Sequence, residues 1–155
     1  MVAILIMAKA PQPGQVKTRL CPPLTPAQAC ACHEAFLLDT LSLVRSSGAV
    51  SYLAYSGSQD WFVQHCPDFQ RFAQQGQDLA ERLDHALQSV LSEQQPVLCI
   101  GSDSPHLPLN LLNLATTWLE NYDVVLGPAQ DGGYYLIGMN QFHDLFLGMP
   151  MSTHR

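Results

Sequence analysis

The sequence predicts an α/β fold, specifically a three-layer α/β/α sandwich with a mainly parallel sheet. Short apolar strands alternate along the chain with amphipathic helical patterns, and this alternation is typical of β-α-β units. Residues 2–8 form a continuous apolar run, as expected of a strand covered on both faces. The chain has 155 residues, of which 47% are hydrophobic and 13% charged, so it can bury a sizeable core. Because no repeat, low-complexity segment or linker divides it, we expect residues 1–155 to form a single domain.

The first half of the chain predicts the order strand, helix, strand, helix, strand. After the strand at residues 2–8 comes a loop rich in proline and glycine. Thr25 can cap a helix whose first turn holds Pro26, where the missing N–H of proline costs nothing, and Gly48 ends this helix. Residues 50–55 then form a strand, residues 60–65 a short helix and residues 69–72 a weak strand. We expect the first helix to bury an apolar face made of Cys30, Leu37, Leu41 and Val44.

The second half begins with the clearest amphipathic helix, which starts at Asp78. Its apolar residues recur at spacings of three and four: Leu79, Leu83, Ala86, Leu87, Val90 and Leu91. Residues 96–101 form another short strand, and strands at residues 122–126 and 134–137 close the fold. Between these come the markers of a further helix: Leu111, Leu112, Ala115, Trp118 and Leu119.

The charge balance and the cysteines exclude several classes of protein. Thirteen acidic against seven basic residues argue against a surface for nucleic acid or anionic membrane. No apolar run approaches the ~20 residues that a membrane span needs. The five cysteines are odd in number and irregularly spaced, which argues against a disulfide framework, and Cys30-Ala-Cys32 lacks the two-residue gap of most zinc pairs. We therefore expect buried thiols and a cytoplasmic protein.

Three segments that follow predicted strands carry unusual chemistry, and ligands of open α/β sheets bind beyond the carboxyl ends of the strands. The first segment is the loop after residue 8, which concentrates three of the seven basic residues, Lys9, Lys17 and Arg19. Gly14 permits close approach of the backbone, and the cations suit phosphate oxygens. The segment is neither a Walker P-loop nor a Rossmann fingerprint. We favour phosphate contact over the alternative of a surface loop with solvated cations.

The second segment places Asp103 directly after a buried strand. Mg²⁺ commonly takes one or two protein carboxylates and completes its shell with substrate phosphates and water. Asp103 can therefore anchor a metal, with Ser102 and Ser104 orienting it. The alternative is that Asp103 or Ser104 caps the helix that follows Pro105, and both roles can hold together.

The third segment runs from residue 127 to residue 138 and contains Asp131-Gly132-Gly133-Tyr134-Tyr135. Asp-Gly between two apolar strands is a strong hairpin signal. The second glycine and the paired tyrosines exceed what a turn requires, and glycines allow a flat or charged ligand to approach the backbone. A plain turn and a ligand-binding loop both remain open for this segment.

Together these segments match a family pattern. The sequence resembles the bacterial nucleotide-diphospho-sugar transferase-like proteins of the glycosyltransferase A-fold, of the radical-SAM/selenodomain-associated transferase type. These are relatives of the molybdenum-cofactor nucleotidyltransferases and the 2-phospholactate guanylyltransferases. The matching stretches are Lys9-Ala-Pro-x-Pro-Gly14-x-Val-Lys17-Thr-Arg19-Leu, Phe36-Leu-Leu-Asp39-Thr, Gly76-x-Asp78-Leu-x-Glu81-Arg82, Gly101-Ser-Asp103-Ser-Pro and Gly127-Pro-x-x-Asp131-Gly-Gly-Tyr-Tyr-Leu-Ile-Gly138.

The resemblance implies a transferase that uses Mg²⁺ or Mn²⁺ and a nucleoside triphosphate or nucleotide sugar, with nucleotidyl or glycosyl transfer to a small acceptor. The residues it assigns to nucleotide and phosphate are Ala8, Lys9, Gly14, Lys17, Arg19, Gly76, Asp78, Arg82 and Ser102. Those it assigns to the acceptor are Asp131, Gly132, Gly133 and Tyr134. The catalytic candidates are Lys17, Asp103 and Asp131, and Asp103 is the expected metal ligand.

The chain also departs from the family pattern. Ala80 stands where the family usually has glycine. Family members continue beyond the position of residue 155 through a strand and helix with an Asp-Val-Asp-Thr-like motif expected to help hold metal. The resemblance therefore implies a C-terminally shortened domain, either a truncated product or a paralogue with weakened metal binding. The alternative function is a non-catalytic nucleotide-binding remnant or interaction protein, and an uncovered sheet edge could support a homo-oligomer.

Overall fold

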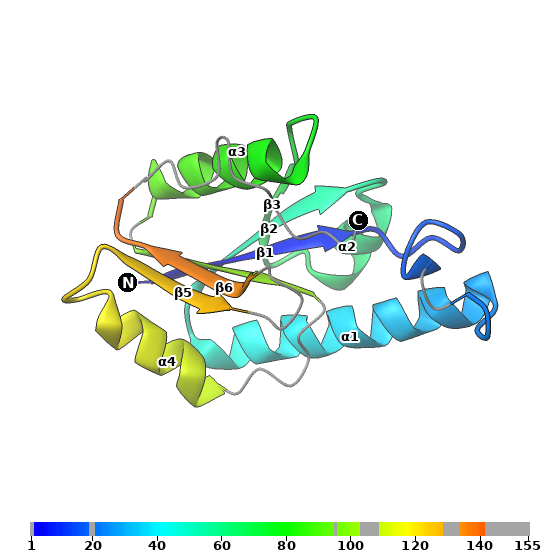
Figure 1. Cartoon of the computed structure of the whole chain (residues 1–155), viewed down its shortest axis with the longest axis horizontal. Coiled ribbons are helices and arrows are strands. Elements are labelled where there is room, and N and C mark those ends of the chain that lie inside the picture. Colours follow the sequence, from blue (N-terminus) through cyan, green and yellow to red (C-terminus); the bar gives the residue numbers. More distant parts are fainter. Residues whose placement is uncertain (1, 19–20, 95, 103–108, 129–133, 142–155) are drawn as a thin grey trace.

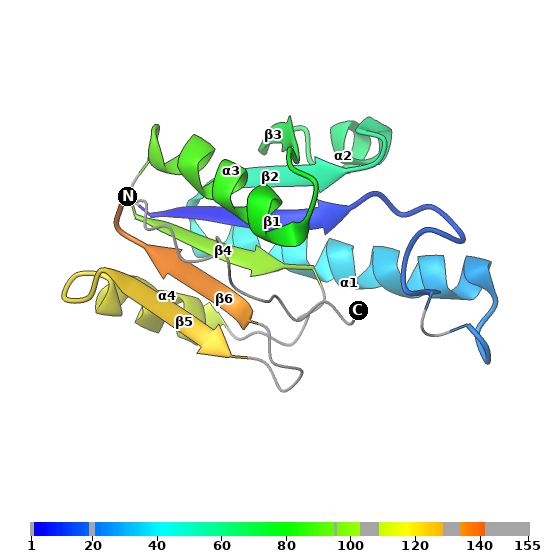
Figure 2. The same ribbon diagram turned by 45° about the horizontal axis from the view of Figure 1, so that its top comes forward.

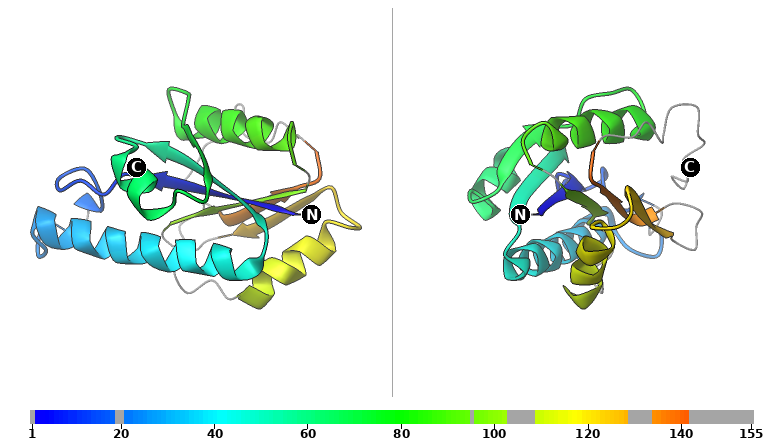
Figure 3. Two further views of the ribbon diagram at one scale, coloured as in Figure 1. Left: turned by 180° about the vertical axis from the view of Figure 1, so that it is seen from behind. Right: turned by 90° about the vertical axis from the view of Figure 1, so that its left-hand side faces the viewer.

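The computed structural model describes residues 2–18, 21–94, 96–102, 109–128 and 134–141, which form a six-stranded sheet between two helical layers (Figure 1). Helices α1 (Pro26–Ser47), α2 (Asp60–His65) and α4 (Leu109–Trp118) cover one face of the sheet. Helix α3 (Leu79–Leu91) covers the other face, so that the views from behind and from the side show three layers (Figure 3). The predicted α/β/α sandwich is confirmed.

The strand order of the sheet is β3-β2-β1-β4-β6-β5. The central strand β1 (Ala3–Lys9) pairs in parallel with β2 (Val50–Ser56) and β4 (Val97–Gly101), and β2 pairs in parallel with β3 (Gln70–Ala73). Strand β6 (Tyr134–Met139) is antiparallel to both β4 and β5 (Val124–Pro128). Strands β1 to β5 therefore all run in one direction and end on one side of the sheet, where β6 begins (Figure 2). We call this side the carboxyl rim.

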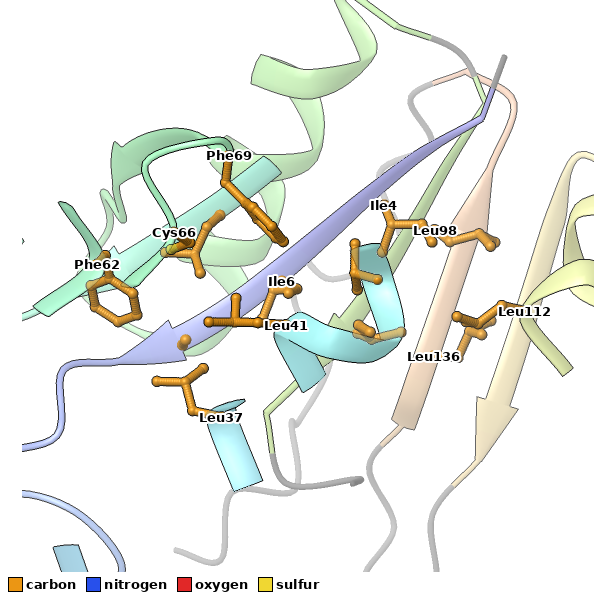
Figure 4. Close-up of a cluster of buried hydrophobic side chains, with 14 of the residues drawn as sticks. Ile4, Ile6, Leu37, Leu41, Phe62, Cys66, Phe69, Leu98, Leu112 and Leu136 are labelled. Atoms are coloured by element: carbon orange, nitrogen blue, oxygen red, sulfur yellow. The ribbon is translucent and has the colours of Figure 1, made fainter. Parts of the chain in front are cut away.

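Two hydrophobic cores explain the uninterrupted apolar run of β1. Successive side chains of a strand point to opposite faces. Ile4 and Ile6 pack into the core shared with α1, α2 and α4 (Figure 4), whereas Ala3 and Leu5 pack into the core under α3. Both faces of the strand are covered, so neither alternate set of side chains can be polar.

None of the helices in the described parts of the chain combines the length and apolar character needed to cross a membrane.

The ends of α1 follow from the predicted signals, but its buried face differs from the predicted one. Thr25 and Gln28 form a reciprocal capping box, and Gly48 ends the helix with φ 74°. The predicted face included Cys30, which is only half-buried. The buried residues are Ala29, His33, Leu37, Thr40, Leu41 and Val44. The face therefore carries a histidine and a threonine whose polar groups bond to backbone carbonyls, a pairing that apolar periodicity does not reveal.

The remaining helices match their predicted positions closely. Helix α2 has the predicted bounds, and Asp78 caps α3, whose predicted apolar face is buried or half-buried. In α4, Leu112 and Ala115 are buried, whereas Trp118, which the sequence grouped with them as a marker of this helix, is 44% exposed.

Candidate active site at the carboxyl rim

The sheet topology brings the predicted site segments to the carboxyl rim. The loop after β1 leaves from this side, as do the residues after β3 and Ser102 after β4, and β6 begins there with Tyr134. Ser102 is only 6% exposed, so the start of the β4 segment lies against the fold. Five predicted site residues lie outside the described residues, namely Arg19, Asp103, Asp131, Gly132 and Gly133.

The loop after β1 has an unusual backbone that is anchored at both ends. Ala8 and Ala10 are buried, and the Ala10 N–H donates to the Ser56 carbonyl at 2.8 Å. Further along the loop the buried Val16 side chain holds the chain against the fold. Gly14 has φ 81° and Lys17 has φ 50°, a left-handed conformation that non-glycine residues rarely adopt. Such backbone persists only where its surroundings hold it, and it clusters at ligand-binding sites.

Two cations of this loop have defined partners. The Lys9 ammonium donates to the Gln15 carbonyl within the same loop at 3.3 Å. The Lys17 Nζ lies over the Phe36 ring of α1, 4.5 Å from the ring centroid. His33, also on α1 and only 5% exposed, donates from Nε2 to the Lys9 carbonyl at 2.7 Å. Helix α1 therefore fixes the cationic loop, a role for His33 and Phe36 that the sequence did not indicate.

The corner between β3 and α3 holds Gly76, Asp78 and Arg82 in a tight arrangement. The Asp78 carboxylate accepts from the Glu81 N–H at 2.9 Å and so caps α3. The Arg82 guanidinium reaches back to the Gly76 carbonyl at 3.1 Å. Gly76 has φ 138°, and a Cβ there would lie 2.8 Å from the backbone nitrogen of Arg82. Only glycine fits this corner, which brings the three residues together beside the rim.

Gln74 is a further residue at the rim that sequence reasoning missed. Its Nε2 donates to the Ala54 carbonyl at 3.0 Å and to the Ala8 carbonyl at 3.4 Å, and its backbone N–H donates to the Tyr55 carbonyl at 2.7 Å. The side chain thus ties the ends of β1 and β2 together beneath the predicted nucleotide site. No local pattern marks such a residue, because its partners are distant backbone atoms.

Neither the cysteines nor the residues that line a surface cavity are among the predicted site residues. All five cysteines are free thiols, and burial raises the pKa of Cys66 to about 11 and that of Cys99 to about 12. These two thiols stay protonated near neutral pH, as expected for structural cysteines. A cavity of about 280 Å³ lies between β3 and α3, where Phe72 and His85 are among its lining residues, and none of the predicted site residues lines it.

No preassembled metal cage is present in the described parts of the chain, where no group of three or more His, Cys, Asp or Glu side chains could hold an ion. After β4 the sequence offers oxygen donors, the Asp103 carboxylate and the hydroxyls of Ser102 and Ser104, of which only Ser102 lies within the described residues. Oxygen donors suit Mg²⁺, which needs few protein ligands when substrate phosphates and water complete its shell.

The sheet order, the antiparallel β6 and the segments at the carboxyl rim define a nucleotide-diphospho-sugar transferase-like fold. The chain belongs to the family described as "Uncharacterized protein conserved in bacteria (DUF2064)", whose model matches residues 40–153.

Solved structures show the same fold. A protein from Desulfovibrio desulfuricans G20, described as a candidate nucleotide-diphospho-sugar transferase, is 35% identical with a TM-score of 0.90, and the match covers 96% of this chain and 68% of that one. A 4-diphosphocytidyl-2C-methyl-D-erythritol synthase is similar at 16% identity and a TM-score of 0.56, covering 84% and 61%. The synthase of that name from Anaerococcus prevotii DSM 20548 is similar at 10% identity and a TM-score of 0.57, covering 90% and 70%. A search of the curated proteins gives no match to the sequence.

Proposed function

We propose that the protein is a transferase that binds a nucleoside triphosphate or a nucleotide sugar at the carboxyl rim and transfers a nucleotidyl or glycosyl group to a small acceptor. The observation that carries the proposal is the cationic loop after β1, which His33 and Phe36 of α1 hold in place. This loop lies at the carboxyl rim, where the other site segments also leave or enter the sheet. The relative from D. desulfuricans, described as a candidate nucleotide-diphospho-sugar transferase, supports this assignment.

The proposed roles follow from the chemistry of each segment. Lys9, Lys17 and Arg19 bind the phosphates, Gly14 lets them approach the backbone, and Ala8 and Ser102 line the floor of the site. Gly76, Asp78 and Arg82 border the nucleotide. Asp131, Gly132, Gly133 and Tyr134 face the acceptor. Such transfer depends on positioned reactants and on cations that stabilise the charge of the leaving phosphate, so it requires no dedicated protein nucleophile.

A divalent cation, Mg²⁺ or Mn²⁺, belongs to the proposal. Asp103 would hold it, oriented by Ser102, and the bound ion would neutralise charge on the phosphate oxygens. Because the sequence offers few protein ligands, metal affinity should be low in the absence of nucleotide and should rise when nucleotide is added.

The test is ligand-induced stabilisation with a panel of nucleoside triphosphates and nucleotide sugars, with and without Mn²⁺. A ligand at a hundred times its Kd stabilises the native state by about 2.7 kcal/mol. For a chain of this size that corresponds to a rise in Tm of roughly 5–11 °C. If no member of the panel raises the Tm, the proposed function is refuted.

Variants sharpen this test. Lys17→Met should abolish most of the nucleotide-induced shift, and Asp103→Asn should abolish its dependence on Mn²⁺. Asp123→Asn, at the exposed position directly before β5 and thus at the opposite end of the sheet from the rim, is the matched control and should leave both unchanged. Pyrophosphate release with an acceptor supports nucleotidyl transfer, whereas release of a nucleoside diphosphate supports glycosyl transfer. Binding without turnover for any acceptor would favour the alternative of a non-catalytic nucleotide-binding protein.

A further inference from the structure

Phe36 lies in one of the family-like stretches of the sequence, yet the proposed chemistry gives it no task. Its ring is half-buried on α1, and the Lys17 ammonium lies over one face, 4.5 Å from the centroid. A cation within about 6 Å of a ring centroid is attracted by the negative face of the ring. The contact joins residues 19 positions apart in sequence, from the loop after β1 to the third turn of the helix.

The surroundings hold Lys17 in place over this ring. Its backbone has φ 50°, and the side chain of the preceding Val16 is buried. Three residues before Phe36 on the same helix, His33 fixes the Lys9 carbonyl at the start of the loop. Residues three apart on a helix are neighbours on its surface, so α1 holds the loop at two points with adjacent side chains. The first turns of α1 lie beside this loop at the end of β1 in the front and tilted views (Figures 1 and 2).

We propose that Phe36 is a positioning residue that presents the Lys17 ammonium to the phosphate groups of the nucleotide substrate. The inference rests on the proposed function and names a further residue of the same site. A lysine side chain is flexible, and ordering it on binding reduces affinity. The ammonium carries three N–H donors, so it can bind a phosphate oxygen while it stays over the ring face. Phe36 thus acts through Lys17 and does not itself contact the substrate.

The experiment compares Phe36→Leu, which keeps an apolar side chain but removes the ring face, with Phe36→Tyr, which keeps the face. The Kd for inorganic pyrophosphate and for the best nucleotide of the panel is measured by calorimetry at low salt. Phe36→Leu should weaken binding about two- to fivefold, the effect of losing one exposed cation–π contact. Phe36→Tyr should bind like the wild type. Leu38→Ala, an exposed apolar truncation on the same helix, is the matched control and should have no effect.

A double-mutant cycle distinguishes positioning from general packing. If Phe36 acts through Lys17, Phe36→Leu should not weaken binding further in a Lys17→Met background. The inference is overturned if Phe36→Leu binds as tightly as the wild type, or if it weakens binding equally with and without Lys17. Should leucine prevent folding, as judged by circular dichroism, Phe36→Met takes its place in the same cycle.

A measurement without ligand separates this inference from the proposed function. The ring should shift the NMR signals of the Lys17 side-chain methylenes upfield in the wild type, and Phe36→Leu should remove that shift. Unshifted signals in the wild type would contradict the ring contact itself. A wild type that shows the shift but binds neither pyrophosphate nor any nucleotide would refute both proposals. A wild type that binds them while Phe36→Leu has no effect would refute only the role of Phe36.

Discussion

Substitution of Gly76 by alanine should destabilise the protein through two separable effects. Gly76 has φ 138°, a backbone conformation that L side chains rarely adopt. A Cβ at this position would lie 2.7 Å from the Glu81 Cβ, 2.8 Å from the backbone nitrogen of Arg82 and 2.9 Å from the carbonyl carbon of Glu81. Two of these three atoms are backbone of the first turns of α3, which cannot move aside like the tip of a flexible side chain. Either the corner or the start of the helix must therefore shift.

The size of the effect follows from these two contributions. An unfavourable backbone conformation costs roughly 1–2 kcal/mol, and forced overpacking typically costs about 1–3 kcal/mol more. The sum of about 2–5 kcal/mol is a large part of the 5–15 kcal/mol by which a typical domain is stable. For a chain of this length it should lower the Tm by roughly 4–20 °C.

The matched control is Gly48→Ala at the end of α1. Gly48 also has a positive φ, 74°, but a Cβ there would meet no atom within 4 Å. Gly48→Ala should therefore cost only the backbone contribution. Urea unfolding followed by circular dichroism gives the free energy of unfolding of both variants. If Gly76→Ala is no less stable than Gly48→Ala, the steric reasoning for the corner between β3 and α3 is wrong.

Three further predictions concern other parts of the fold. Asp78→Ala should cost about 0.5–2 kcal/mol in urea unfolding, because it removes the acceptor that caps α3; Asp78→Asn, which keeps an acceptor oxygen, should recover most of that loss. Leu37→Ala should cost about 2–5 kcal/mol, because the side chain is fully buried in the core under α1, and a smaller cost would contradict that packing. The hydrogen bond from Arg45 lowers the pKa of Asp68 below its ordinary value, so the pair contributes stability above about pH 4 and loses it as the pH falls through the lowered pKa. The contribution should stay below about 1 kcal/mol because both groups are exposed, and the difference in urea midpoint between wild type and Asp68→Asn should vanish at low pH and shrink in high salt.

Local rules were sufficient for most of the fold. The run at residues 2–8 predicted a strand covered on both faces, and the two cores on either side of Ile4 and Leu5 show why. Thr25, Gly48 and Asp78 were recognised as helix ends because capping depends on the side chain and on a few neighbouring residues. These rules failed where burial depends on distant partners. Trp118 follows the apolar spacing of α4 but is 44% exposed, and spacing alone does not reveal which of these positions the rest of the fold leaves uncovered.

The antiparallel direction of β6 shows the same division. The Asp131-Gly132 signal predicted a hairpin, and β5 and β6 are indeed adjacent and antiparallel. A hairpin signal does not specify which of its strands lies next to β4. In the structure β6 lies there, so that the later strand of the hairpin separates β5 from the rest of the sheet. The order is fixed by long-range packing, such as that of Gly138, where a Cβ would lie 2.8 Å from the Leu98 side chain and 3.1 Å from Leu119.

The candidate site, too, could be predicted only in part from the sequence. The rule that ligands bind beyond strand ends selected the candidate segments, because strand direction follows from the β-α-β pattern. The rule could not identify His33, Phe36 or Gln74, since these side chains bind backbone carbonyls or a cation that the fold brings from more than 15 residues away. His33 occupies a helix position that apolar periodicity would assign to the core. Its hydrogen bond to the Lys9 carbonyl explains why a polar side chain is buried there. The candidate substrate-binding segments were thus recognisable in the sequence, whereas the contacts that hold the loop after β1 in place appear only in the folded chain.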